Sequence, residues 1–202
     1  MQAGDTLELT DGQGFLYRAV ISEADPKKCR FTIIEKREAL VSDFTISIAV
    51  APTKNIDRTE WFIEKAVEIG IHKIYPILCK HSERKTVNLD RLTKISISAM
   101  KQSGQSRLPL ITGMIPFQEI VMHEAGQKFI CHVDAANPDL LKTLAHPKQN
   151  YLVLIGPEGD FSQEEIQLAS EKGFRKVSLG PHRLRTETAA LTACQMLNFI
   201  NL

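Results

Sequence analysis

The chain has 202 residues, 43% of them hydrophobic and 24% charged, with a formal net charge of +1. These values are typical of a globular protein that holds one domain of ordinary size and a small second one. They exclude a chain that is basic throughout, and no apolar run approaches the roughly 18 residues that a membrane helix needs. Residues 1–5 lack the basic and apolar regions of a secretory signal.

The cysteines and histidines show no metal-ligand spacing, and no metal is expected. No C-x-x-C pair occurs among the cysteines, which stand at positions 29, 79, 131 and 194. This spacing favours free thiols in a reducing cytoplasm over a disulfide framework or a zinc site.

The pattern of residues 5–36 predicts short strands joined by tight turns. Residues 6–10 alternate, Asp11-Gly12 is a typical hairpin turn, residues 15–21 run back, and residues 31–34 form a further strand. A dinucleotide-binding loop at Gly12-x-Gly14 is the alternative, but Tyr17 stands where the third glycine is needed and no helix follows. The charged residues 35–38 lead out of this region, and we place the domain boundary within residues 36–44, giving domains 1–40 and 41–202.

From residue 46 on, strands and helices alternate. Strands are predicted at residues 46–50, 73–78, 129–133, 151–155 and 176–179. Helices are predicted from a capping box at Asp57 and Glu60 to Gly70, at residues 89–103, from a capping box at Ser162 and Glu165 to Gly173, and at residues 187–200. This alternation predicts an α/β domain with a mostly parallel sheet covered on both faces.

Two apolar strands in the last quarter each lead into a turn with glycines and charged residues, and each turn opens a helix. In open α/β sheets, ligands bind outside the carboxyl ends of the strands. The two turns are therefore expected to line one small-molecule pocket.

A second feature of the sequence is a stretch rich in basic residues. Residues 80–107 carry seven Lys and Arg residues against Glu83 and Asp90. Such a stretch either binds phosphates on a nearly neutral protein or is an ordinary solvated helix face.

Several motifs resemble those of one family. They are Leu154-Ile155-Gly156-Pro157-Glu158-Gly159, Leu179-Gly180-Pro181, Leu184-Arg185-Thr186-Glu187-Thr188-Ala189, Arg58-Thr59-Glu60, Lys65-Ala66-Val67-Glu68-Ile69-Gly70, and Ala99-Met100-Lys101-Gln102-Ser103 with Arg107-x-Pro109. By these motifs the chain is similar, over essentially its whole length, to the bacterial 16S ribosomal RNA (uracil-N3)-methyltransferases of the SPOUT class.

The resemblance implies a small N-terminal β-barrel related to PUA domains and an α/β domain whose C-terminal part forms a trefoil knot. Knots are so rare that the sequence pattern alone does not predict one. The family also implies a homodimer that binds S-adenosylmethionine in the knot and methylates N3 of a uridine in 16S rRNA of the small ribosomal subunit.

The chain departs from the family pattern in two places. Relatives extend further upstream than Met1, so the PUA-like barrel is expected to be N-terminally truncated and incomplete. Asp160 stands where many relatives have a second glycine. Because Asp tolerates turn conformations well, no loss of cofactor binding is expected.

The resemblance assigns cofactor contacts to the two C-terminal motifs. Their glycines let backbone groups approach a ligand, although each could be an ordinary turn glycine, and their apolar side chains would line the adenine and methionine, or only pack in the core. The implied residues are Leu154, Ile155, Gly156, Glu158, Gly159, Leu179, Gly180, Leu184, Thr186, Thr188 and Ala189.

Methylation at N3 requires removal of the N3 proton or stabilisation of the uracil anion. Arg185 can donate to a uracil oxygen or a phosphate, and Glu187 is a candidate general base or a partner that fixes Arg185. Glu158 is an alternative base, unless backbone N–H groups satisfy it in its turn.

RNA contacts are expected at Arg58, Lys101, Gln102, Ser103 and Arg107, the basic ones on phosphates. Arg58 could instead form a surface ion pair with Glu60. Alternative functions are a SPOUT-fold RNA-binding protein without catalysis, a SPOUT methyltransferase with another target atom, and a nucleotide-binding module without RNA.

Overall fold

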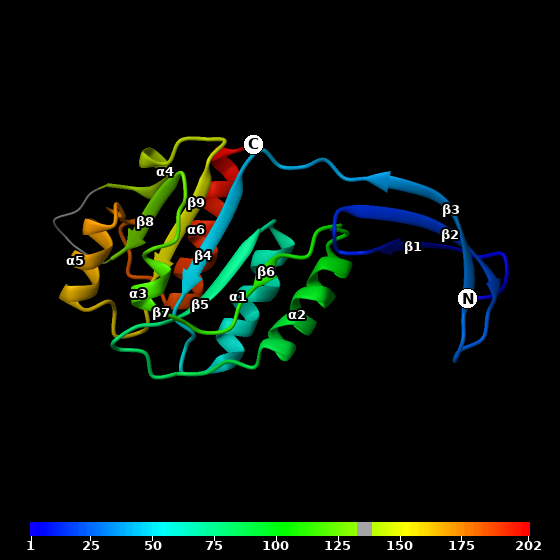
Figure 1. Cartoon of the computed structure of the whole chain (residues 1–202), viewed down its shortest axis with the longest axis horizontal. Helices are drawn as coiled ribbons and strands as arrows, with labels where there is room; N and C mark the ends of the chain where they lie inside the picture. Colours follow the sequence, from blue (N-terminus) through cyan, green and yellow to red (C-terminus); the bar gives the residue numbers. More distant parts are fainter. Residues whose placement is uncertain (133–138) are drawn as a thin grey trace.

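The computed structural model describes residues 1–132 and 139–202. A larger α/β body carries a slender N-terminal β-sheet that extends from one end of it (Figure 1). The N-terminus lies in this sheet, and the C-terminus lies on the larger body.

The N-terminal sheet is antiparallel, in the order β1 (Thr6–Thr10), β2 (Phe15–Glu23), β3 (Arg30–Glu38). Between β1 and β2, Asp11 Oδ1 accepts the main-chain N–H groups of Gln13 at 2.8 Å and Phe15 at 3.3 Å. Gly14 has a φ of +105°, a left-handed conformation that favours glycine. The hairpin interpretation of Asp11-Gly12 is therefore confirmed.

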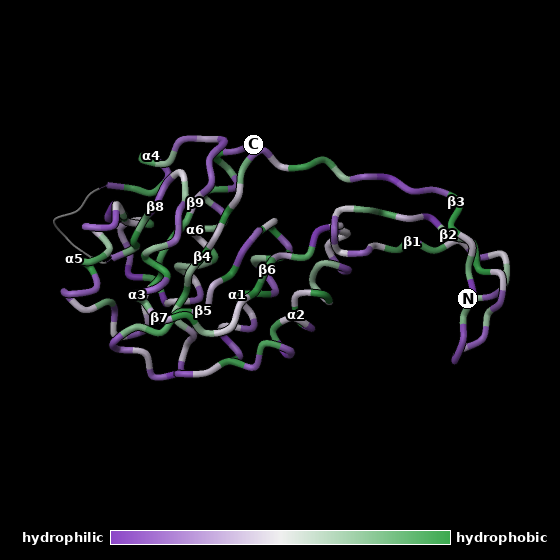
Figure 2. Tube along the Cα trace, in the orientation of Figure 1, coloured by the Kyte–Doolittle hydropathy of each residue, from purple (hydrophilic) through white to green (hydrophobic). Residues whose placement is uncertain are grey.

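Strand β3 is longer than the sequence pattern predicted. Its hydrophilic second half (Figure 2) was expected to lead out of the sheet, but it pairs with β2. Glu35 lies 3.4 Å from Arg18 on β2, and Lys36 Nζ lies 3.8 Å from the centre of the Phe15 ring. Cross-strand charge and cation–π contacts thus allow a charged segment to remain a strand.

The larger body is built on a parallel sheet, as the alternation of strands and helices predicted. Within the described residues the sheet has seven strands, in the order β10-β8-β9-β4-β5-β6 with β7 beside β5. They are β4 (Thr45–Val50), β5 (Lys73–Leu78), β6 (Leu110–Ile111), β7 (Ile115–Pro116), β8 (Gln127–Cys131), β9 (Asn150–Ile155) and β10 (Arg175–Val177).

Helices cover both faces of this sheet. Successive strand residues point to opposite faces, so that Ile46, Ile48 and Val50 pack under α1 (Ile56–Glu68), α2 (Leu89–Gln102), α4 (Leu141–Leu144) and α6 (Thr186–Ile200). On the opposite face, Ala49 and Ala51 pack with α3 (Phe117–Ile120) and α5 (Gln163–Glu171). The burial of both faces explains why the strands are apolar without alternation.

Most element ends lie close to the predicted ones, with three corrections. Helix α1 begins at Ile56 because Asn55, not Asp57, is the N-cap; its side chain accepts the N–H of Asp57. The capping box of Ser162 and Glu165 is present in both directions. Strand β8 ends at Cys131, whereas the prediction ran to Val133, which lies outside the described residues, and β10 ends two residues before Leu179.

The two sheets are joined through the segment after α2. Gly14 N–H donates to the Ser106 carbonyl at 2.9 Å, and Leu108 N–H donates to the Gly12 carbonyl at 2.8 Å. The β1–β2 turn is thereby held against the C-terminal end of α2 (Figure 1). Strands β6 and β7 and helices α3 and α4 escaped the sequence analysis because each has at most four residues.

Candidate active site

A pocket of about 910 Å³ opens outside the carboxyl ends of β8, β9 and β10. The turn after β9 and the loop after β10 both line it, so the prediction that these two strand ends form one pocket is confirmed. The strand order places the end of β8 between them. This is where ligands bind in open α/β sheets.

The turn after β9 contains a strained backbone position. Asp160 has a φ of +61°, a left-handed conformation in which glycine is the usual residue. Its side chain compensates: Oδ1 accepts the N–H of Phe161 at 2.8 Å, and Oδ2 lies 2.9 Å from His132 Nδ1. These contacts explain how Asp can occupy a left-handed position that favours glycine.

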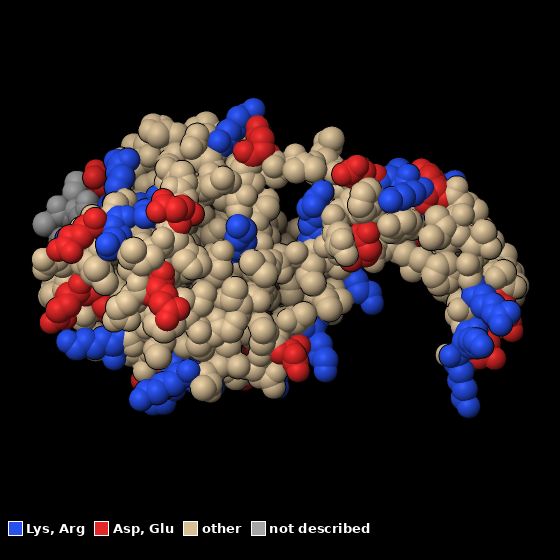
Figure 3. Space-filling model, viewed as in Figure 1, with Lys and Arg blue, Asp and Glu red and all other residues tan. Residues whose placement is uncertain are grey.

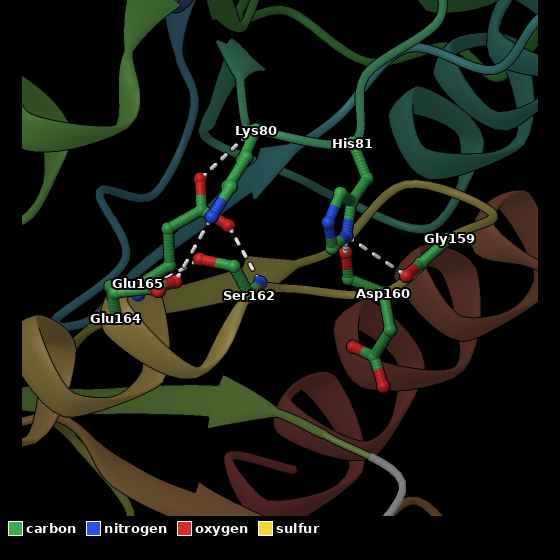
Figure 4. Close-up of polar contacts among 7 residues, drawn as sticks. All are labelled: Lys80, His81, Gly159, Asp160, Ser162, Glu164 and Glu165. Carbon is green, nitrogen blue, oxygen red and sulfur yellow. Dashed lines mark hydrogen bonds and ion pairs between the residues drawn. The ribbon is translucent and has the colours of Figure 1, made fainter.

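The loop after β5 holds this turn from outside (Figure 4). His81 Nδ1 lies 3.2 Å from the Gly159 carbonyl and 3.0 Å from the Asp160 carbonyl. Because carbonyl oxygens only accept, we assign the proton to Nδ1 of His81. The turn is thereby anchored to a neighbouring loop of the same domain.

The start of α6 forms another wall of the pocket. Thr186 Oγ1 donates to the Gly156 carbonyl at 3.1 Å, which ties the two motifs together. Glu187 is 8% exposed, and its Oε1 lies 3.9 Å from Arg58 Nε. Its Oε2 is buried without a hydrogen-bond partner within the described residues. A buried carboxylate oxygen without a partner is available to a ligand that carries a hydrogen-bond donor.

Arg58 lies in the pocket and does not form the surface ion pair with Glu60 that was one of its two interpretations. Glu60 pairs with Arg91, at 2.6 Å between Oε1 and Arg91 Nε, so the surface pair of Arg58 and Glu60 is wrong. Arg58 instead lines the pocket beside Glu187. Only the packing of α1 against α6 brings these two residues together.

Most residues assigned to the cofactor line the pocket. They are Ile155, Gly156, Glu158, Leu179, Gly180, Leu184, Thr186 and Ala189, together with Arg185 and Glu187. The pocket lining does not include Leu154, which is fully buried in β9, Gly159, which faces His81, or Thr188, which is exposed on α6. Glu158 Oε1 accepts the main-chain N–H of Lys54 at 3.0 Å, which matches its interpretation as a turn carboxylate.

The other residues assigned to RNA lie apart from the pocket. Lys101 and Gln102 are exposed at the C-terminal end of α2, and Arg107 lies beside Gly14 of the N-terminal sheet. The Ser103 hydroxyl donates to the Ala99 carbonyl at 2.8 Å and so caps the helix. This group therefore marks the junction of the two sheets (Figure 1).

The basic stretch of residues 80–107 is not one uniform phosphate-binding face. Lys80 pairs with Glu164, Arg84 donates to the carbonyls of residues 53 and 54, and Arg91 pairs with Glu60. Lys and Arg alternate with Asp and Glu over the face shown in Figure 3. Three of the seven basic side chains are therefore engaged with other parts of the fold.

Sequence reasoning missed His132, which also lines the pocket. The prediction placed it inside a strand, whereas β8 ends one residue before it. A polar residue at the carboxyl end of a strand is the signal that could have identified it.

Within the described residues, no helix is long and apolar enough to cross a membrane. Over the same residues, no cluster of His, Cys, Asp and Glu could hold a metal ion. All four cysteines are free.

The fold and the pocket define an α/β domain with a ligand site at the carboxyl ends of its strands, attached to a small β-domain. A family model described as RNA methyltransferase domain matches residues 41–198, and one described as RNA methyltransferase PUA domain matches residues 1–34. The chain belongs to this family of RNA methyltransferases.

Individual relatives agree with this family assignment. The crystal structure of a probable rRNA-methyltransferase from Porphyromonas gingivalis is 43% identical with a TM-score of 0.93, over 100% of this chain and 87% of that one. A ribosomal RNA small subunit methyltransferase E from Neisseria gonorrhoeae, bound to S-adenosyl methionine, is 26% identical with a TM-score of 0.88, over 100% and 85% of the two chains. The Rickettsia conorii protein of the same name is 29% identical over 99% of this chain and 83% of its own length.

Proposed function

We propose that this protein transfers a methyl group from S-adenosylmethionine to N3 of a uridine in 16S rRNA of the small ribosomal subunit. The observation that carries the proposal is the pocket that unites both C-terminal motifs with Arg58 and Glu187. The names of the relatives support the RNA substrate, and the ligand of the Neisseria structure supports the cofactor. The uridine N3 follows from the motif resemblance and the chemistry below.

The pocket fits S-adenosylmethionine. Its volume lies within the roughly 300–1,000 Å³ of small-molecule sites. Ile155, Leu179, Leu184 and Ala189 supply apolar walls, and Gly156 also lines the pocket. When bound, this cofactor supplies a methyl group on a positively charged sulfur.

Uridine N3 becomes a nucleophile only when its proton is lost. We assign the role of accepting the N3 proton to Glu187 Oε2, the buried oxygen without a hydrogen-bond partner. The N3 electron pair then forms the bond to the methyl carbon as the carbon–sulfur pair returns to sulfur. Arg58, beside Glu187, stabilises the negative charge that develops on the uracil oxygens.

Arg185 lies exposed at the pocket, and its side chain makes no hydrogen bond or ion pair with the described residues. Because its charge is permanent, we assign it to a phosphate or uracil oxygen of the bound RNA. Lys101, Gln102 and Arg107 would hold RNA backbone at the junction with the N-terminal sheet.

We also propose a homodimer acting in the cytoplasm, where bacterial ribosomes assemble. Trp61 on α1 is 44% exposed and Phe199 on α6 is 65% exposed. Large apolar side chains left exposed on helices that pack together favour a protein contact. Sedimentation of the purified chain at twice its monomer mass would support this assignment, and a monomer would refute it.

The deciding experiment combines calorimetry and methyl transfer. The chain should bind about one S-adenosylmethionine per subunit and convert one uridine of small subunits that lack the modification into 3-methyluridine, identified by mass spectrometry of the digested rRNA. Glu187→Gln and Arg58→Ala should lower the rate about 100-fold, the scale of general base and electrostatic catalysis, with cofactor affinity retained. Arg175→Ala, exposed on β10 outside the pocket lining, is the control and should act as wild type.

Three outcomes would contradict the proposal. RNA binding without cofactor binding would identify a non-catalytic RNA-binding protein. A methyl group on ribose or on another base would identify a different target atom. Wild-type rates in Glu187→Gln would remove Glu187 from the proton transfer.

A further inference from the structure

The pocket holds a polar pair that the roles assigned so far leave unused. His132 Nδ1 lies 2.9 Å from Asp160 Oδ2, and the two side chains are 16% and 30% exposed. Both residues line the pocket. They come from different strand ends, so the pair is made by the tertiary structure.

The strand order gives the pair its place in the pocket. Because β8 lies between β9 and β10, His132 at the end of β8 stands between the two motif turns. Arg58 and Glu187 belong instead to the first turns of α1 and α6. His132 therefore lies between the two turns whose residues are assigned to the cofactor.

The pair also fixes which ring nitrogen of His132 can accept a hydrogen bond. A carboxylate only accepts, so the proton of the neutral imidazole resides on Nδ1 and Nε2 keeps its lone pair. A ligand group opposite Nε2 must then be a donor. In a nucleoside whose base lies between apolar walls, the ribose hydroxyl groups are donors that need an acceptor once water is excluded.

The backbone conformation of Asp160 also indicates that the contact between Asp160 and His132 has a role. It keeps a φ of +61°, where glycine would be unstrained, and its carboxylate makes the contact with His132. The carboxylate orients the imidazole in the way that outer partners orient metal-bound and catalytic histidines.

We propose that His132 Nε2 accepts a hydrogen bond from a ribose hydroxyl of bound S-adenosylmethionine, and that Asp160 is the positioning residue that holds the imidazole for it. The inference rests on the proposed function, since it needs the cofactor in this pocket. It assigns two residues to cofactor recognition that the motif resemblance does not include.

Calorimetry of the full chain tests this without any turnover. His132→Ala should bind S-adenosylmethionine about 5- to 10-fold more weakly, the effect of one neutral hydrogen bond. Asp160→Gly removes the carboxylate but suits the left-handed backbone, and it should lose a similar factor. Asp160→Asn keeps an oxygen that can accept from Nδ1 and should lose less. His146→Ala, an exposed histidine outside the pocket lining, should bind as wild type.

Deoxy analogues separate a direct contact from a structural effect. The 2′-deoxy or the 3′-deoxy form of S-adenosylhomocysteine should bind the wild type more weakly than S-adenosylhomocysteine itself does. His132→Ala should bind that deoxy form and the parent compound equally well. Equal discrimination by His132→Ala and wild type, or no discrimination by the wild type, would overturn the proposal.

The remaining outcomes are equally informative. Unchanged affinity in His132→Ala with lost turnover would overturn the cofactor contact and make the imidazole a proton acceptor. Wild-type protein that binds no S-adenosylmethionine would refute the proposed function itself, whereas a wild type that binds and variants that bind equally would refute only this inference.

Discussion

Glu165 joins the first turn of α5 to the loop after β5, and its replacement should destabilise the fold. The carboxylate is 6% exposed. Oε1 accepts the main-chain N–H of Lys80 and Oε2 accepts that of Ser162, each at 2.8 Å (Figure 4). One side chain thus accepts hydrogen bonds from two main-chain N–H groups, one 85 residues away in the sequence and the other 3 residues away.

The size of the effect follows from these two bonds. Glu165→Ala leaves both N–H groups without an acceptor, and each buried unsatisfied donor costs about 1–3 kcal/mol. We expect the free energy of unfolding to fall by about 3–4 kcal/mol, a large share of the roughly 5–15 kcal/mol that a domain has. Glu165→Gln keeps one acceptor oxygen and should lose about half as much.

Urea denaturation at pH 7, followed by circular dichroism, measures the change. Glu171→Ala is the matched control, because Glu171 is exposed in the last turn of the same helix, and it should change stability by less than about 0.5 kcal/mol. A loss below about 1 kcal/mol in Glu165→Ala, or one equal to the control, would show that water replaces the carboxylate. The reasoning from burial would then fail.

Three further changes test other contacts. Gly156→Ala places a Cβ 3.2 Å from the Phe161 ring and should lose about 1–3 kcal/mol in urea denaturation, whereas Gly113→Ala meets no atom within 4 Å and should lose little. Gln105→Ala frees two carbonyls at the end of α1 and should lower the midpoint of thermal unfolding by several degrees. Burial raises the pKa of the Cys194 thiol from 9.0 to about 12, so the stability that it contributes is complete below pH 9 and declines above it; scanning calorimetry from pH 8 to 10 should show a shallower decline in Cys194→Ala.

Local features of this protein were predictable from the sequence. The Asp11-Gly12 hairpin and the capping box of Ser162 and Glu165 form as expected, because their hydrogen bonds join residues two to four apart. The parallel sheet followed from the alternation of apolar strands with amphipathic helices, since each helix must bury one face against the strands that flank it. Even here one cap was predicted wrongly, since the sequence analysis placed it at Asp57 and the N-cap of α1 is Asn55.

The site required the tertiary structure. The motifs pointed to one pocket, but the position of Arg58 beside Glu187, 129 residues further along the chain, depends on how α1 and α6 pack together. His132 entered the pocket only because β8 lies between β9 and β10, a strand order that no local pattern encodes. Periodicity and capping report interactions within a few residues, whereas the order of strands is decided by burial of the whole sheet, and that is where the chemistry of this protein is assembled.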